Sequence, residues 1–214
     1  MAALILAFDT SVAHCAAALL SGERVVAARH EAMAKGQAER LLPLLAEVLA
    51  EGGVGWRDLT ALAVGVGPGN FTGVRIAVAA ARGLALALQV PAIGVSALEA
   101  AAHGLPRPLA VVEDARRGEV YLQVFGCDGA QAAQVCAVAD LPPLLGALAL
   151  AGSAAAAVAA LTGGAVLAPA CPLAEAIARI ARLRLGSSQP RPAPFYLRGA
   201  DAAPPSDPAP VLLP

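Results

Sequence analysis

The chain has 214 residues and a formal net charge of −1. Charged residues make up 14% and hydrophobic residues 58% of it, whereas soluble domains average about 25% charged residues. Nucleic-acid-binding domains carry a clustered basic surface that neutralises phosphates. The arginines here are scattered, so we expect the chain not to provide most of the contacts to a nucleic acid.

The cysteines and the apolar segments indicate a cytoplasmic protein. No two of the four cysteines have metal-site or redox spacing, which is typical of buried thiols in a reducing compartment; they are Cys15, Cys127, Cys136 and Cys171. Residues 2–8 are apolar but lack a basic region before them, so they do not predict a signal peptide. Residues 141–174 carry no charge, but prolines and glycines divide them into pieces too short to cross a membrane.

The periodicity of the first half predicts three strands followed by alternating helices and strands. Alternating apolar residues predict the strands, and apolar residues three and four apart predict the helices. The expected strands are 4–8, 12–20, 24–29, 59–66 and 92–95, and the expected helices are 37–50, 72–88 and 97–103.

The second half repeats this order after a proline-rich boundary at 106–108. The expected strands are 109–112, 119–125, 133–138, 147–151 and 165–168, and the expected helices are 141–145, 153–161 and 173–185. Three meandering strands followed by alternating helices and strands form a ribonuclease H-like unit, and two such units in tandem form an actin-like α/β fold with mixed sheets flanked by helices. We therefore expect subdomains at 1–105 and 106–189, followed by a proline-rich tail at 190–214, in which residues 195–198 dock back on the body.

A glycine-rich segment between a strand and a helix is the most specific local motif. It comprises residues 65–75, with Gly67, Pro68, Gly69, Asn70, Thr72 and Gly73 in its turn. Backbone N–H groups at such a helix start can bind an anion. Alternatively, the glycines permit a tight turn in which Asn70 or Thr72 caps the helix. The motif is neither a Walker loop, because no lysine follows Gly73, nor a dinucleotide-binding fingerprint.

Each half opens with a strand that ends in aspartate, Asp9 and Asp114. In actin-like folds such strand ends face one another across a nucleotide cleft, so Asp9, Thr10, Ser11 and Asp114 are candidate residues of an active or vestigial cleft. The carboxylates could hold magnesium, or they could accept hydrogen bonds from the following turn. The three histidines are scattered, so we expect no metal site.

Two helices are apolar over more of their surface than a single core-facing stripe requires. We expect part of this surface to bind a partner, through Leu41, Leu45, Val48, Leu49, Val74, Ala77, Val78 and Ala81. On this hypothesis Leu45→Asp disrupts pairing while the fold survives. The alternative is that both helices are fully buried within the chain.

Five motifs in order resemble the bacterial TsaB (YeaZ) family. They are GPGNFTGVR at 67–75, LAFDTS at 6–11, ERLLP at 39–43, DARRGEVY at 114–121 and YLR at 196–198. The resemblance implies the actin-like fold and a cytosolic complex with TsaD, the catalytic paralogue, and TsaE, an ATPase. TsaD transfers a threonylcarbamoyl group to the adenosine beside the anticodon of tRNA.

The same resemblance implies a scaffold without catalytic residues or a cofactor of its own. The complex uses ATP or ADP and a metal, and tRNA contacts this subunit only indirectly. Family members pair with TsaD or with themselves, as homodimers. TsaD holds its metal with two histidines four residues apart on its first helix, and Gln37 and Leu41 occupy that spacing here. The other functions considered are a small nucleotide-dependent kinase or transferase and a metalloprotease, which would need a ligand cluster.

Overall fold

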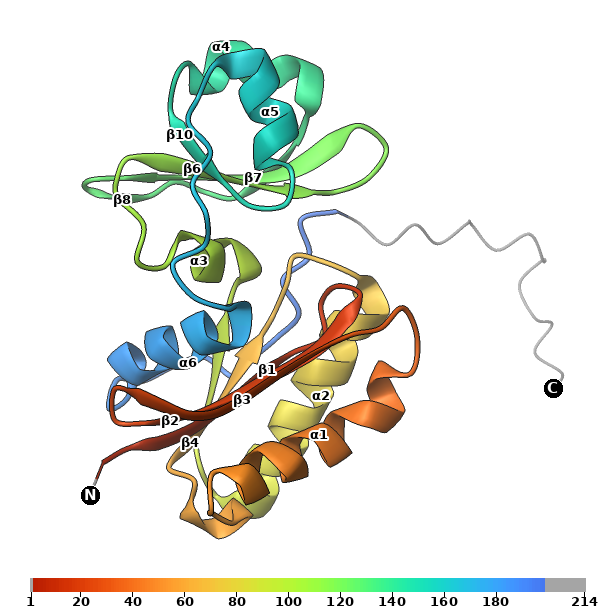
Figure 1. Cartoon of the computed structure of the whole chain (residues 1–214), viewed down its shortest axis with the longest axis vertical. Helices are drawn as coiled ribbons and strands as arrows, with labels where there is room; N and C mark the ends of the chain where they lie inside the picture. Colours follow the sequence, from red (N-terminus) through yellow and green to blue (C-terminus); the bar gives the residue numbers. More distant parts are fainter. Residues whose placement is uncertain (1, 199–214) are drawn as a thin grey trace, which may run out of the picture.

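The computed structural model describes residues 2–198 as two α/β units, one above the other in Figure 1. The first unit is built on a five-stranded sheet of order β3-β2-β1-β4-β5. Its first three strands form an antiparallel meander, and β4 and β5 add in parallel to β1. The strands are β1 (Leu4–Asp9), β2 (His14–Ser21), β3 (Arg24–Ala32), β4 (Ala61–Gly65) and β5 (Ala92–Val95).

Helices cover both faces of this first sheet, because β1 is apolar on both sides. Leu6 and Phe8 pack with α1 (Gln37–Glu51) and α2 (Phe71–Leu88) on one face. Ile5 and Ala7, which alternate with them, pack with α6 (Leu173–Arg184) on the other. A short 3-10 turn, η1 (Trp56–Asp58), connects α1 to β4.

The second unit repeats the meander in a smaller form. Its sheet has the order β10-β6-β7-β8, and β9 also pairs with β7. The strands are β6 (Leu109–Asp114), β7 (Glu119–Gly126), β8 (Gly129–Ala130), β9 (Gln134–Ala137) and β10 (Ala149–Ala151); α4 (Leu141–Leu145) and α5 (Ala155–Thr162) pack on it, after the turn η2 (Val138–Asp140). The strand expected at 165–168 is reduced to one bridge between Val166 and Leu150. The tandem actin-like α/β architecture is confirmed.

The two units exchange helices, which corrects the predicted boundaries. Helix α6 follows the second unit in sequence but packs on the first sheet, with Ile177 against Ile5 and Ala7. In the other direction, α3 (Ala97–Ala102) precedes the boundary yet packs Leu98 against the second sheet. The predicted 106–189 subdomain therefore loses its last helix, because the apolar face of α6 completes the core of the first unit.

Candidate functional site

A cleft of about 1130 Å³ separates the two units. It brings together residues that the sequence analysis singled out from distant parts of the chain. Its lining includes Ser11, Pro68, Gly69, Asn70, Thr72 and Gly73 from the first unit and Asp114, Arg116, Tyr121 and Ser153 from the second. Asp9, Thr10 and Gly67 lie behind this lining, in the buried wall of the cleft.

The carboxylate of Asp9 is fully buried and is used within the fold. Its Oδ1 accepts hydrogen bonds from the backbone N–H of Ser11 at 2.9 Å and from the Ser11 hydroxyl at 2.8 Å. The same oxygen lies 2.8 Å from Nε2 of His14. The other oxygen, Oδ2, has no hydrogen-bond partner and points at Gly65, where a Cβ would lie 1.8 Å away. Asp9 is therefore placed to hold its own turn rather than a ligand in the cleft.

Asp114 makes the equivalent turn in the second unit. Its Oδ1 accepts a hydrogen bond from the backbone N–H of Arg116 at 2.8 Å, two residues on, as Asp9 does from Ser11. Its own N–H donates to the Ser153 hydroxyl at 3.0 Å. Unlike Asp9, Asp114 is exposed to the cleft. Both strand ends thus use their aspartate as a turn cap, which was one of the two expected roles.

The glycine-rich loop lies directly on the backbone that follows Asp9. A Cβ on Gly73 would lie 1.9 Å from the carbonyl oxygen of Thr10, and one on Gly69 would lie 2.3 Å from that of Ser11. The Thr10 hydroxyl donates to the Gly73 carbonyl at 2.7 Å, and the Asn70 N–H donates to the Ser11 carbonyl at 2.6 Å. These contacts require glycine, because any side chain would separate the two backbones.

The start of α2 is capped from within the same loop. The Asn70 side chain accepts a hydrogen bond from the Gly73 N–H at 2.9 Å, as a helix N-cap does. Gly67 has a φ of +93°, in the region that favours glycine, and the peptide bond to Pro68 is cis. Thr72 is exposed at the cleft rim. The loop thus adopts the expected tight turn with Asn70 as its cap.

Histidine, cysteine and acidic side chains do not cluster in the described part of the chain. Within residues 2–198, no group of three or more of them could hold a metal ion. His14 packs edge-on against His30, with ring centroids 5.0 Å apart, while burial lowers the pKa of His103 in a different part of the first unit.

Comparisons with known proteins place the chain in a family. A family model described as "TsaD: tRNA N6-adenosine threonylcarbamoyltransferase" matches residues 30–169. The "tRNA threonylcarbamoyladenosine biosynthesis protein TsaB" of Escherichia coli (strain K12) is 43% identical over 123 residues, or 55% of this chain and 52% of that protein. The protein of the same name in Bacillus subtilis (strain 168) is 37% identical over 127 residues, or 56% of this chain and 54% of that protein. The chain belongs to the TsaB (YeaZ) branch of this family.

A solved TsaB-type structure extends the similarity over most of the fold. "YeaZ from Pseudomonas aeruginosa" superposes with a TM-score of 0.71 at 29% identity, over 91% of this chain and all of that one. By sequence, the chain spans about half the length of the TsaB relatives it matches.

A short segment after α6 completes the cleft of this TsaB-family chain. The Phe195 N–H donates to the Val66 carbonyl at 2.7 Å. The Tyr196 ring stacks on Phe71 with centroids 5.0 Å apart, and its hydroxyl accepts a hydrogen bond from Arg75 at 2.9 Å. The expected docking of 195–198 is confirmed; the rest of the predicted tail, 199–214, lies outside the described residues.

The predicted partner residues lie in the core, so that assignment is wrong in detail. All eight side chains are at most 2% exposed, and they pack on the first sheet; they are Leu41, Leu45, Val48, Leu49, Val74, Ala77, Val78 and Ala81. Each helix has apolar side chains on more than one side, so the sequence alone could not show which stripe faces the sheet.

The outward faces of α1 and α2 carry a different set of small and apolar residues. We call Leu42, Ala46, Ile76, Ala79 and Gly83 the outer helix face; Leu42 is 48% exposed, and Ile76 is half-buried. Helix α2 is long and apolar enough to span a membrane, and only 28% of it is buried within the chain. Its inner stripe packs in the core of the first unit, whereas Ala79 and Gly83 on its outer stripe are exposed.

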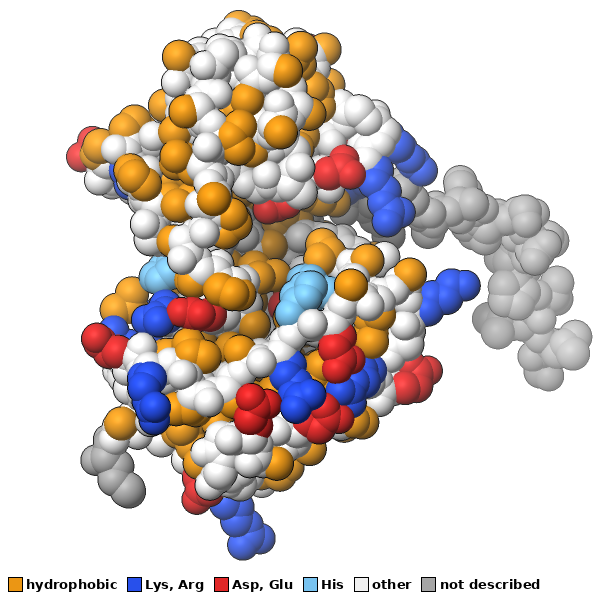
Figure 2. Space-filling model, in the orientation of Figure 1, with side chains coloured by type: hydrophobic (Ala, Val, Ile, Leu, Met, Phe, Trp, Pro, Cys, Tyr) orange, Lys and Arg blue, Asp and Glu red, His pale blue; other side chains and the backbone are white. Residues whose placement is uncertain are grey.

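Figure 2 shows charged side chains gathered on one face of the first unit. The visible charged cluster lies over α1 and β3, where Arg40 pairs with Glu31 and Glu47 at 2.6 Å each. These bonds to Arg40 lower the pKa of both carboxyl groups.

Proposed function

We propose that this chain is a non-catalytic, cytoplasmic subunit of the machinery that installs threonylcarbamoyl on the adenosine beside the anticodon of tRNA. The names of the TsaB relatives support a role for this chain in that process. The observation that carries the role as a subunit is the outer helix face, a set of exposed or half-buried small and apolar residues on α1 and α2. We expect the chemistry to take place on a TsaD-type partner.

The cleft supports a role without catalysis. A catalytic carboxylate must reach its substrate or metal, whereas Asp9 is buried and hydrogen-bonded to its own turn. The glycine-rich loop uses its N–H groups at Asn70 and Gly73 within the fold. Accordingly, we propose that ATP or ADP and metal act elsewhere in the complex and that tRNA contacts this chain only indirectly.

Gly83 supports the proposed position of the partner contact. It lies in the middle of α2, where glycine is less stable than alanine by roughly 0.5–1 kcal/mol. Within the described residues, no atom outside the adjoining backbone of α2 and the two neighbouring residues lies within 4 Å of where a Cβ would be, so packing there does not require glycine. With Ala79 one turn earlier, Gly83 would let a partner helix approach the backbone of α2 closely.

Co-purification with the TsaD-type protein of the same organism tests this proposal. We expect Gly83→Glu to abolish recovery of the partner, because it places a charge and a long side chain on the contact. Ala157→Glu, on the exposed face of α5, is the matched control and should retain the partner. Equal recovery with both variants, each shown to be folded by circular dichroism, would exclude the outer helix face as the contact.

Self-association is the second use of the same face that we propose. Without a TsaD-type partner, the outer helix faces of two copies can cover one another, and a TsaE-type ATPase would join only the heteromeric complex. Analytical ultracentrifugation of the chain alone, of Gly83→Glu and of the mixture tests this competition. A homodimer that persists in Gly83→Glu would show that self-association uses another surface.

The size of the cleft favours one alternative, a small nucleotide-dependent kinase or transferase. A volume of about 1130 Å³ can accept a nucleotide, and Asp114 is exposed within it. This alternative requires the isolated chain to hydrolyse or transfer the γ-phosphate of ATP with magnesium and to lose that activity in Asp114→Asn. Under our proposal, the isolated chain shows no such turnover.

A further inference from the structure

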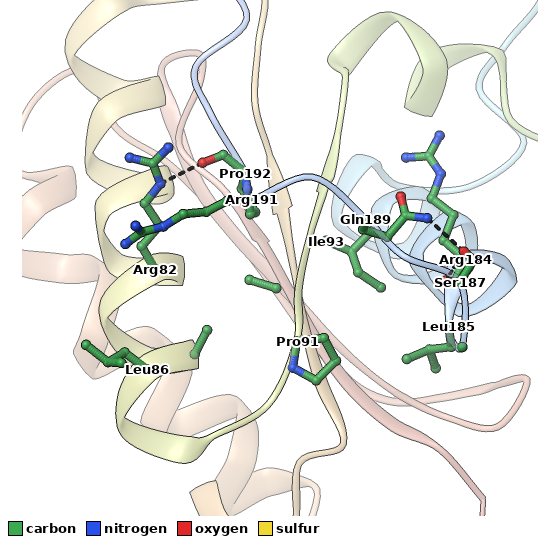
Figure 3. Close-up of a pocket in the computed structure, with 13 residues that line it drawn as sticks. Arg82, Leu86, Pro91, Ile93, Arg184, Leu185, Ser187, Gln189, Arg191 and Pro192 are labelled. Atoms are coloured by element: carbon green, nitrogen blue, oxygen red, sulfur yellow. Dashed lines mark hydrogen bonds between the residues drawn. The ribbon is translucent and has the colours of Figure 1, made fainter.

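A second cavity, of about 540 Å³, lies along the outer edge of the first sheet. It shares no lining residue with the cleft between the units. Figure 3 shows its walls: α2 on one side, the end of α6 on the other, and β5 and the segment 185–192 between them. Small-molecule pockets typically measure about 300–1,000 Å³, so the cavity has a suitable size.

The charged side chains that line this cavity are all arginines. They are Arg82, Arg184 and Arg191, and no aspartate or glutamate lines it. Arg184 is neutralised, because it pairs with Glu99 and donates to the Gly94 carbonyl at 2.9 Å. The other two arginines have no acidic partner among the described residues, although the whole chain carries a net charge of −1.

The two unneutralised guanidinium groups come from α2 and from the neighbouring segment 185–192. Arg82 projects from α2 and donates its Nε to the Pro192 carbonyl at 2.6 Å, which leaves its two terminal nitrogens available. Arg191, next to Pro192 in the chain, is exposed and makes no hydrogen bond or ion pair with residues 2–198. Figure 3 shows both side chains at the same end of the cavity. A planar guanidinium binds carboxylate and phosphate oxygens through paired N–H groups.

The remainder of the lining is mostly apolar. Leu86, Pro91, Ile93 and Leu185 project into or beside the cavity from three different elements. The backbone of β5 adds a polar edge. The Pro91 carbonyl accepts a bond from Leu62 of β4, so the next residue, Ala92, turns its N–H and C=O toward the free edge of the sheet, where it lines the cavity.

We propose that this cavity is a binding site for a small anionic molecule with an apolar body. Arg82 and Arg191 hold its phosphate or carboxylate group, and the apolar body lies over Leu86, Ile93 and Leu185. The site shares no residue with the cleft or with the outer helix face, and it goes beyond the proposed role in tRNA modification. Arginine recognises phosphate and carboxylate groups through the same paired hydrogen bonds, so the test must use a compound of each kind.

Calorimetric titration of the full chain with phenyl phosphate and with phenylacetate tests the site. We expect at least one to bind. Inorganic phosphate, which lacks the apolar body, and phenol, which lacks the anionic group, should bind more weakly by about tenfold or more. The tighter of the two aromatic anions identifies the headgroup. No measurable binding of either at millimolar concentration would overturn the proposal.

Charge reversal at the rim supplies the second test. Arg191→Glu should weaken binding by about tenfold or more, while the fold stays intact because Arg191 makes no bond within the described structure. Arg57→Glu is the matched control, since it changes the net charge equally at an exposed site outside the cavity. Equal weakening by both variants would mean that the anion responds only to overall charge, and the proposal would be wrong.

Discussion

Arg198 forms an ion pair with Glu119, and its Nη1 donates to the Ala115 carbonyl at 3.0 Å. These two contacts join the segment after α6 to the first hairpin of the second unit. Three residues earlier, Phe195 is bonded to Val66 in the first unit. Four consecutive residues therefore connect both units at the rim of the cleft.

Replacing Arg198 with glutamine should loosen the second unit while leaving the first intact. The arginine side chain is only 26% exposed, so we expect Arg198→Gln to cost about 1 kcal/mol or less of local stability. Hydrogen exchange should accelerate in residues 115–126 and stay unchanged in the first sheet. Arg57→Gln is the control, and unchanged exchange in residues 115–126 of Arg198→Gln would show that the contact does not hold the second unit.

The sequence was sufficient to predict the elements and their order, because each depends on local periodicity and turn residues. It was insufficient for the exchange of α3 and α6 between the units. The apolar face of α6, which includes Ile177 and Ile180, could pack on either sheet. Only the complete packing shows that the first sheet lacks a cover on that face and the second does not.

The sequence was likewise sufficient for only part of the candidate cleft. The strand-end aspartates, together with the element order of an actin-like fold, were enough to predict that Ser11 and Asp114 lie at one cleft. It could not predict that Asp9 is buried behind the lining while Asp114 is exposed, because both precede similar turns. The difference arises from the loops packed on the two strand ends. The glycine-rich loop lies on the backbone of Thr10 and Ser11, whereas Gly152 lies on the Val112 carbonyl and leaves the Asp114 side chain exposed.

Two leucines on α1 should respond oppositely to a charge. Leu45 is fully buried, so Leu45→Asp places an unpaired carboxylate in the core and should destabilise the fold by about 4 kcal/mol or more. Leu42 is 48% exposed, and Leu42→Asp should remain folded. Thermal melts followed by circular dichroism measure both. A native-like melting temperature for Leu45→Asp would contradict the position of α1 against the sheet.

Replacing Gly73 or Gly83, both in α2, with alanine should have opposite effects on stability. Gly73→Ala forces a Cβ to within 1.9 Å of the Thr10 carbonyl oxygen, so the loop must move and stability should fall by about 1–3 kcal/mol. In Gly83→Ala, the new Cβ meets no described atom within 4 Å beyond its own stretch of helix, so the change should stabilise the isolated chain by roughly 0.5–1 kcal/mol. Urea unfolding of the two variants compares them directly. Destabilisation by Gly83→Ala in the isolated chain would mean that α2 packs more tightly there than the structure shows.

The buried thiol of Cys15 should be unreactive in the folded chain. Burial, with a smaller contribution from the nearby Glu31 carboxylate, raises the pKa of Cys15 from 9.0 to about 11. Because the thiolate is the reactive form, we expect Cys15 to resist iodoacetamide at pH 8 while the exposed Cys127 is modified. Mass spectrometry of peptides labelled before and after unfolding in urea distinguishes the two residues.

The same pKa shift predicts how stability depends on pH. The folded-state pKa lies above the unfolded value, so the contribution of Cys15 is fully present below about pH 9 and declines as the pH rises toward 11. Cys15→Ala removes this titration, so it should flatten the loss of stability between pH 9 and 11, measured by urea unfolding. Cys127→Ala is the control and should leave the slope unchanged. An identical slope in all three proteins would show that Cys15 does not titrate differently in the folded state.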